Sequence, residues 1–207
     1  MRTLVIDTAT KACSVALYDG EVLIDSFHEV IGRGHAERLL TLIAKLPSCG
    51  KADHIVVDVG PGSFTGIRVG VAAARALGLA WNVEVTGYGC LALVAAMARQ
   101  AIGDNRVIDV VMTGGHGEYF FQSFDPTGSE LIEPVSLTPE RLAEQSQASV
   151  LAGDIAPELT LMNRDYEFVD LLPSASYWHL VAALPALPPS PVYGRAPDAK
   201  LPKAKLA

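Results

Sequence analysis

The chain has little of what membrane-spanning or disulfide-stabilised proteins require. None of its apolar runs approaches the roughly 18 residues that a helix needs to cross a membrane. The apolar run after Met1-Arg2 is too short for a secretory signal and is followed by no small-residue cleavage site. The three scattered cysteines, Cys13, Cys49 and Cys90, form no CxxC pair, which favours a reducing compartment. We therefore predict a cytoplasmic protein without membrane contact.

Positive charge is also scarce. The chain carries 16 Lys and Arg residues against 23 Asp and Glu residues, which gives a net charge of −7. Surfaces that bind nucleic acid neutralise several phosphates with clustered basic residues, and no dense basic run is present here. The basic residues near the C-terminus are separated by apolar residues and proline: Arg195, Lys200, Lys203 and Lys205. We expect the isolated chain to bind nucleic acid poorly.

The first half of the chain alternates strands and helices. Half of all residues are apolar and 19 % are charged, which indicates a well-cored globular protein. Short apolar runs predict strands at residues 4–6, 14–18, 22–24, 55–59 and 83–86. Apolar residues at helical spacing predict helices at residues 35–46, 64–80 and 91–100. This order is typical of a ribonuclease-H-like α/β lobe, in which helices cover a mixed sheet.

The second half repeats this order more faintly. Strands are predicted at residues 107–112, 118–124, 131–135 and 150–152. Helices are predicted after the cap residue Thr138 and at residues 177–183, and the chain from Pro185 onward is too rich in proline for regular structure. We therefore predict two tandem lobes, residues 1–104 and a reduced second lobe of residues 105–207 with a proline-rich tail.

The segment Gly60-Pro61-Gly62-Ser63 joins a predicted strand to a predicted helix. It is not a P-loop, because the Gly-Lys-Ser/Thr ending is missing. Such a loop can present backbone N–H groups to a phosphate, or it can be a sharp turn in which Ser63 caps the helix. Asp7, at the end of the first strand, either contributes to a metal–phosphate site or caps a turn. The candidate nucleotide-proximal residues are Asp7, Gly60, Gly62 and Ser63.

Small residues recur at every fourth position of the helix predicted at residues 64–80. These positions are Gly66, Gly70, Ala74 and Gly78. A glycine inside a helix costs about 1 kcal/mol relative to alanine, so the stripe does not serve helix stability. A face without side chains lets another element approach closely, either within the same chain or in a partner. The opposite face carries Arg68 and Arg75 and is predicted to be partly exposed.

No local pattern supports a metal site or a nucleophile. The five histidines are isolated in sequence, so no pair has the spacing of metal ligands. The cysteines have no neighbouring histidine, and the Gly-x-Ser-x-Gly motif of serine hydrolases is absent. We expect no metal site, no cofactor and no catalytic residue in this chain.

Several ordered motifs together resemble the TsaB family, also called YeaZ. They are TLVIDTATKACSVALYDG at residues 3–20, GHAERLL at 34–40, VDVGPGSFTGIRVGVAAARALGLAWNVEVTGYGCLALVA at 57–95 and PVYGRAPDAK at 191–200. The match is dense through about residue 100 and returns at the last motif. The resemblance implies a duplicated ribonuclease-H-like fold of the actin, Hsp70 and sugar-kinase superfamily.

The resemblance also implies a place beside TsaD, the related subunit that transfers a threonylcarbamoyl group to the N6 atom of an adenosine in tRNA. A small ATPase, TsaE, joins the two, so this chain would meet tRNA only indirectly, through the complex. The implied contact surface lies on the helices that begin at His35 and Phe64, and it could form a homodimer in isolation. The expected interface residues are Arg33, His35, Glu37, Arg38, Gly66, Arg68, Gly70 and Ala74.

One departure from the resemblance bears on catalysis. TsaD carries an HxxxH-type metal pair after its fifth strand, whereas this chain reads Thr86-Gly87-Tyr88-Gly89-Cys90-Leu91, without histidine. Without two imidazoles, the metal that orients the acyl-adenylate lacks evident ligands. We therefore expect a non-catalytic scaffold that activates a TsaD-like subunit. The alternatives are an ATP-dependent phosphotransferase or ATPase that uses Asp7 and the glycine-rich loop, and a glycopeptidase.

Overall fold

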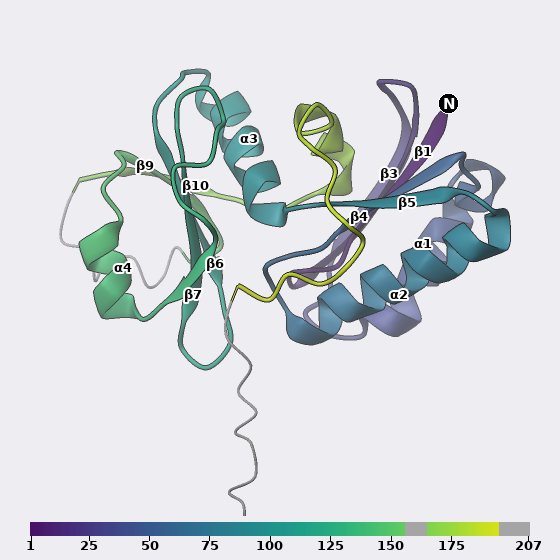
Figure 1. Ribbon diagram of the computed structural model, residues 1–207, viewed down its shortest axis with the longest axis horizontal. Coiled ribbons are helices and arrows are strands. Elements are labelled where there is room, and N and C mark those ends of the chain that lie inside the picture. The colour runs from purple at the N-terminus through teal and green to yellow at the C-terminus, as the bar shows by residue number, and fades with distance from the viewer. Residues whose placement is uncertain (156–164, 195–207) are drawn as a thin grey trace, which may run out of the picture.

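Two lobes lie side by side in the computed structural model, which describes residues 1–155 and 165–194 (Figure 1). Each lobe is built around a five-stranded sheet. The first sheet contains β1 (Arg2–Asp7), β2 (Ala12–Asp19), β3 (Val22–Val30), β4 (His54–Asp58) and β5 (Glu84–Tyr88). The second sheet contains β6 (Ile108–Thr113), β7 (Tyr119–Phe124), β8 (Val135–Leu137), β9 (Val150–Gly153) and β10 (Glu167–Asp170).

The two sheets share one topology. Their strand orders, β3-β2-β1-β4-β5 and β8-β7-β6-β9-β10, correspond position by position. In each sheet the first strand in sequence pairs antiparallel with the second and parallel with the fourth. The prediction of two tandem ribonuclease-H-like lobes with mixed sheets flanked by helices is therefore confirmed.

The central strand β1 is covered on both faces. Leu4 and Ile6 belong to the hydrophobic cluster of α1 (His35–Lys45) and α2 (Phe64–Trp81), which lie together beside the first sheet (Figure 1). Val5, between them, packs in the cluster that includes Tyr18 and Leu93 of the opposite face. Because Leu4, Val5 and Ile6 are all fully buried, the sequence at the centre of this strand is an uninterrupted apolar run.

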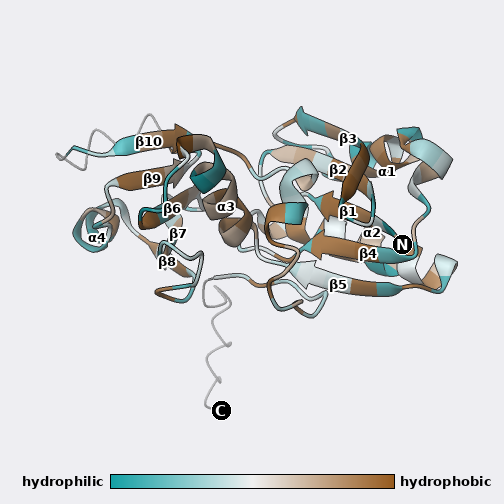
Figure 2. Ribbon diagram, turned by 90° about the horizontal axis from the view of Figure 1, so that it is seen from above, coloured by the Kyte–Doolittle hydropathy of each residue, from teal (hydrophilic) through white to brown (hydrophobic). Residues whose placement is uncertain are grey.

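One helix separates the two sheets. α3 (Cys90–Ile102) packs against β6, and the short α4 (Pro139–Gln145) covers the outer face of the second sheet (Figure 1). Figure 2 shows the apolar stretches gathered on the strands and on α3, with polar stretches toward the loops. No helix among the described residues combines the length and apolar character needed to cross a membrane.

Two predicted elements of the second half differ in the structure, and one strand was not predicted. The helix predicted at residues 177–183 is instead a 3₁₀ helix, η3 (Ala175–Leu180), whose Ser176 carbonyl accepts a 2.7 Å hydrogen bond from Tyr18 Oη. The strand predicted at residues 131–135 is replaced by the three-residue β8. β10 was not predicted, because only its two central residues are apolar.

The segment that follows η3 returns to the first lobe. Leu187 forms a β-bridge with Gly87 of β5, and the Val192 N–H donates a 2.7 Å hydrogen bond to the Val59 carbonyl. Arg75 of α2 donates to the hydroxyl of Ser190 at 3.0 Å. These residues follow the second sheet in sequence but contact the first lobe. The division of the chain into domains after residue 104 stays a prediction.

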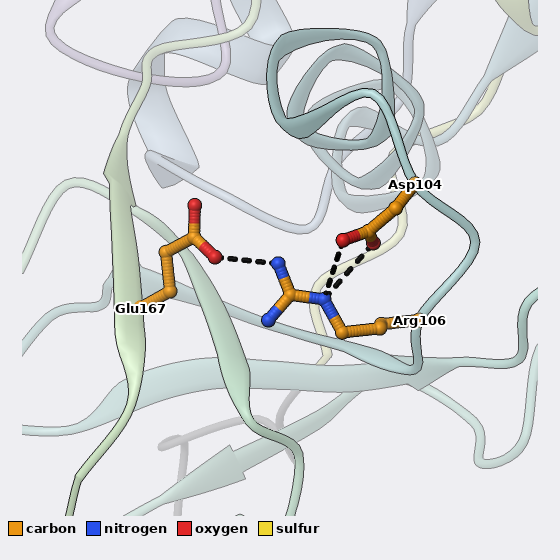
Figure 3. Close-up of polar contacts among 3 residues, drawn as sticks. All are labelled: Asp104, Arg106 and Glu167. Carbon is orange, nitrogen blue, oxygen red and sulfur yellow. Dashed lines mark hydrogen bonds and ion pairs between the residues drawn. The ribbon is translucent and has the colours of Figure 1, made fainter.

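The connection between α3 and β6 is tied to the edge of the second sheet. Arg106 Nε donates to both carboxylate oxygens of Asp104, at 2.9 and 2.8 Å, and Arg106 Nη2 donates to Glu167 of β10 (Figure 3). The hydrogen bonds from Arg106 lower the pKa of Asp104 below its usual value. All three side chains are partly exposed, so this contact positions the connection and adds little stability.

The stripe of small residues on α2 faces its own chain. A Cβ atom added to Gly66 would collide with the Thr8 carbonyl oxygen, and one added to Gly78 would collide with the side chain of Val85. Thr8 Oγ1 donates a 2.8 Å hydrogen bond to the Gly66 carbonyl across the same contact. The intramolecular alternative therefore holds for this stripe, which lets α2 approach β1 and β5 closely.

This packing predicts that Gly66→Val destabilises the fold by about 2–3 kcal/mol, because the added side chain overlaps the backbone of Thr8, directly after β1. Ala72→Val introduces the same residue on the exposed face of α2 and should change stability by only a few tenths of a kcal/mol. Urea unfolding of both variants tests this expectation. Equal stability of the two variants would contradict it.

Candidate functional site at the glycine-rich loop

The glycine-rich loop is held against the β1–β2 connection. The Ser63 N–H donates a 2.6 Å hydrogen bond to the Ala9 carbonyl, and the Ser63 side chain accepts one from the Gly66 N–H at 3.2 Å. The Gly60 N–H donates to Asp58 Oδ1 at 2.7 Å. The peptide bond between Gly60 and Pro61 is cis. Three N–H groups of this segment are thus bonded within the chain.

The glycines of the loop are required by close contacts. A Cβ atom on Gly62 would collide with the Ala9 carbonyl oxygen, and one on Gly60 would lie 2.6 Å from the Val192 carbonyl oxygen. Gly60 also has a φ of +100°, which side chains rarely tolerate. Close approach of the chain to itself, and not of a phosphate, explains the glycines at both positions.

Asp7 is enclosed at the carboxyl end of β1. Its side chain is 0 % exposed, and its Oδ2 accepts a 2.8 Å hydrogen bond from the Tyr88 hydroxyl. Its Oδ1 accepts a longer hydrogen bond, 3.4 Å, from the Ala9 N–H. Burial raises the pKa of Asp7 to about 6, although the hydrogen bond from Tyr88 opposes the shift.

Asp58, at the end of the neighbouring strand β4, completes a buried acidic pair. Its side chain is 0 % exposed, and among the described residues its Oδ2 has no hydrogen-bond partner. Burial, and next the charge of Asp7, raise the pKa of Asp58 well above its usual value. Because two buried carboxylates side by side repel each other, the pair disfavours carrying two negative charges at once.

The remaining members of this cluster are neutral. Burial raises the pKa of Tyr88 and of Cys90 well above their usual values, and the nearby acidic pair raises them further. The Cys90 thiol donates to the Pro61 carbonyl at 2.9 Å. A protonated, fully buried thiol is a poor nucleophile, so this arrangement disfavours the glycopeptidase alternative.

The expected nucleotide-proximal residues, Asp7, Gly60, Gly62 and Ser63, stay a prediction. Mg²⁺ and phosphates need an accessible carboxylate and free N–H groups, whereas here Asp7 and Asp58 are buried and the N–H groups of Gly60 and Ser63 are bonded within the chain. No group of three His, Cys, Asp or Glu side chains within residues 1–155 and 165–194 could hold a metal ion. The cluster therefore serves to join β1, β4 and β5 at their carboxyl ends.

Four of the expected interface residues are buried within the chain. His35 is 7 % exposed, and its Nε2 contacts the Ala12 carbonyl at 3.1 Å. Gly66, Gly70 and Ala74 lie on the buried face of α2. In the folded chain these four residues therefore present little surface, and their place in a partner interface stays a prediction.

The other four expected interface residues lie at the surface. Arg33 and Glu37 are exposed beside the start of α1. Arg38 is half-buried and forms a two-pronged ion pair with Glu29 of β3, with Nη2 at 2.6 Å from Oε1. The hydrogen bonds in this pair lower the pKa of Glu29.

Arg68 is occupied by the C-terminal segment. Its guanidinium lies over the ring of Phe64 at 3.5 Å, and its Nε donates a 2.9 Å hydrogen bond to the hydroxyl of Tyr193. The Phe64 and Tyr193 rings are 5.2 Å apart. The basic residues near the C-terminus, Arg195, Lys200, Lys203 and Lys205, lie outside the described residues.

Asp58, Tyr88 and Cys90 were not among the predicted site residues. The signal for Asp58 was a charged residue inside the apolar strand sequence IVVDV, where burial is expected. Tyr88 and Cys90 gave no comparable signal, because their neighbours in the cluster are distant in sequence: Tyr88 bonds to Asp7, and the Cys90 thiol bonds to Pro61.

The buried pair predicts a specific pH dependence of stability. Because the folded-state pKa of Asp7 is raised from 3.8 to about 6, the stability associated with it is complete below about pH 4 and is lost as pH rises through about 6. The pKa of Asp58 is raised in the same direction, so Asp58 adds to this loss. Asp58→Asn, which is isosteric with the protonated acid, should reduce this loss between pH 5 and pH 8 by at least about 1 kcal/mol. Urea unfolding across that range measures it.

The exposed carboxylate variant Glu21→Gln serves as the control and should follow the wild-type profile. An Asp58→Asn profile that coincides with the wild-type profile would show that the pair does not titrate in this range.

The chain matches known proteins along most of its length. The profile of the family described as "TsaD: tRNA N6-adenosine threonylcarbamoyltransferase" matches residues 27–182. A protein of Escherichia coli K12 named "tRNA threonylcarbamoyladenosine biosynthesis protein TsaB" is 32 % identical over 196 residues, which cover 84 % of this chain and 83 % of that protein.

Solved structures agree with this match. YeaZ from Pseudomonas aeruginosa superposes with a TM-score of 0.79 at 28 % identity, covering 93 % of this chain and 99 % of that one. The ethanolamine utilization protein EutJ from Carboxydothermus hydrogenoformans, with a TM-score of 0.51 at 13 % identity, shares the fold. The expected resemblance is confirmed, and the chain belongs to the TsaB/YeaZ family.

Proposed function

We propose that this chain is a non-catalytic, partner-binding subunit of the machinery that makes threonylcarbamoyladenosine in tRNA. The observation that carries the proposal is its similarity, over 84 % of the chain, to a protein named for that biosynthesis. The proposed partners are a TsaD-like catalytic subunit and a TsaE-like ATPase, with tRNA contacted only through the complex.

The chemistry of the acid cluster supports a non-catalytic role. The stretch from Thr86 to Leu91 contains no histidine, and its two ionisable side chains, Tyr88 and Cys90, are buried and neutral. A metal that orients an acyl-adenylate needs accessible imidazole or carboxylate ligands. We infer that the transfer step belongs to the partner.

The exposed faces of α1 and α2 form the proposed partner surface. The two helices pack against each other on one side of the first sheet (Figure 1). They expose large apolar side chains: Leu40 is 55 %, Phe64 56 % and Leu79 86 % exposed. Arg33 and Glu37 add charges near the start of α1. Exposed apolar residues on two adjacent helices, with charges beside them, suit a protein interface, and the same surface could pair with a second copy.

We expect Leu40→Arg to weaken association with the TsaD-like protein of the same organism at least about tenfold, because it places a charge within the proposed apolar contact. Leu131→Arg is the matched control, since Leu131 is 54 % exposed on the second lobe and should leave association unchanged. Size-exclusion chromatography with light scattering detects the complex, and titration calorimetry measures its affinity.

Equal affinity of the two variants would exclude this face as the interface. If the wild-type chain forms no complex, with or without nucleotide, the partner proposal itself fails.

Reconstitution tests the division of roles. We expect the chain alone to form no threonylcarbamoyladenosine from tRNA and threonylcarbamoyl-adenylate, and to raise the yield when it is added to the TsaD-like and TsaE-like proteins. Nucleoside analysis of the digested tRNA by mass spectrometry measures the product. Product formed by the isolated chain would overturn the non-catalytic assignment.

A further inference from the structure

A cavity of about 420 Å³ lies between the lobes, on the face of β4 and β5 that is turned toward α3. Gly60, Pro61 and Tyr88 border it, whereas Asp7, Asp58 and Ser63 do not line it. Small-molecule sites in proteins occupy about 300–1,000 Å³, so this cavity has the size of a binding site. The partner surface proposed above lies on the other face of the first sheet.

The walls of the cavity come from three parts of the chain. β5 and α3 contribute Tyr88 and Leu91, and the second lobe contributes Phe124, although these side chains are only 7 %, 1 % and 1 % exposed. The segment after η3 supplies the third wall. There Leu184 and Leu187 remain 47 % and 38 % exposed, so apolar side chains also form the rim.

The polar groups of the walls are satisfied within the protein. His54 Nε2 and Thr86 Oγ1 share a 2.9 Å hydrogen bond, and Gln122 Nε2 donates to the Ile132 carbonyl at 3.2 Å. Burial lowers the pKa of His54, which keeps its ring neutral at pH 7. Within residues 1–155 and 165–194, no Lys or Arg lines the cavity, and the acid among its lining residues, Glu130, is exposed to solvent.

From this lining we propose that the cavity is a binding site for a small, uncharged and largely apolar molecule. An anionic ligand such as a nucleotide would lose its hydration without gaining a cationic partner, and it would approach the carboxylate of Glu130. An apolar ligand gains from contact with the buried aromatic and aliphatic walls. This site is independent of the proposed partner surface.

A ligand bound in the cavity would connect the two lobes. A ligand there contacts the first sheet, the second lobe and the C-terminal segment at once. Binding to the folded state alone raises the apparent stability of the protein, so a ligand of this class should also raise the melting temperature.

The test compares two fluorescent probes that share one ring system. N-phenyl-1-naphthylamine is uncharged, and 8-anilino-1-naphthalenesulfonate adds a sulfonate to the same rings. We expect saturable, one-to-one binding of the uncharged probe and at least about tenfold weaker binding of the anionic one. Equal binding of the two probes, or no saturable binding of the uncharged one, would overturn the proposal.

Two variants locate the binding. Ala92→Phe should fill the cavity and weaken binding of the uncharged probe at least about tenfold, whereas Ala96→Phe adds the same ring one turn later on α3, outside the cavity. Circular dichroism and melting temperature establish that both variants fold. If Ala92→Phe does not fold, Ala182→Phe fills the cavity from its exposed wall and replaces it. Unchanged binding in the cavity-filling variant would place the probe elsewhere and reject this site.

Discussion

The close packing of α2 on β1 is the contact on which the rest of the structure depends. Gly66 and Gly70 leave no side chain between helix and strand, and Thr8 Oγ1 bonds to the Gly66 carbonyl across the contact. With α2 this near the sheet, the preceding loop is pressed onto the chain after β1, where the Ser63 N–H meets the Ala9 carbonyl. The position of the loop therefore follows from the packing of the helix behind it.

This packing decides the chemistry at the carboxyl ends of the strands. In sequence, Asp7 and the glycine-rich loop share the residue types of a phosphate site. In the folded chain the N–H groups of Gly60 and Ser63 are bonded internally, while Tyr88 donates a hydrogen bond to the fully buried Asp7. The outcome is a buried acidic cluster that joins three strands and presents no accessible carboxylate.

The C-terminal segment gives the two lobes a shared surface. It crosses from the second sheet to β5, bonds to Val59 and ends with Tyr193 against Arg68 of α2. One side of the first lobe thereby presents α1 and α2, the proposed partner surface, and the other side holds the apolar cavity between the lobes. The proposed partner and the proposed ligand accordingly occupy opposite faces of one sheet, so each can be tested without the other.

The sequence by itself determined the duplicated α/β architecture and the family. Strand and helix periodicities are local, so β1, α1, β4, α2 and α3 were predicted within a few residues. The prediction was weaker where tertiary contacts contribute, as at η3, which is a 3₁₀ helix whose Ser176 carbonyl accepts a hydrogen bond from Tyr18 of β2. β10 was not predicted for a related reason, because it is a strand through its pairing with β9 and its own composition gives little sign of one.

Only the tertiary structure decided what the predicted site residues do. Glycines at every fourth position indicate a close approach, but they do not specify whether the neighbour is a partner or the strand β1. The burial of His35, the pairing of Asp7 with Asp58 and the contact of Arg68 with Tyr193 join residues far apart in the chain. Burial and pKa depend on such distant neighbours, whereas periodicity depends on adjacent ones, and this is why the fold was predictable and the site was not.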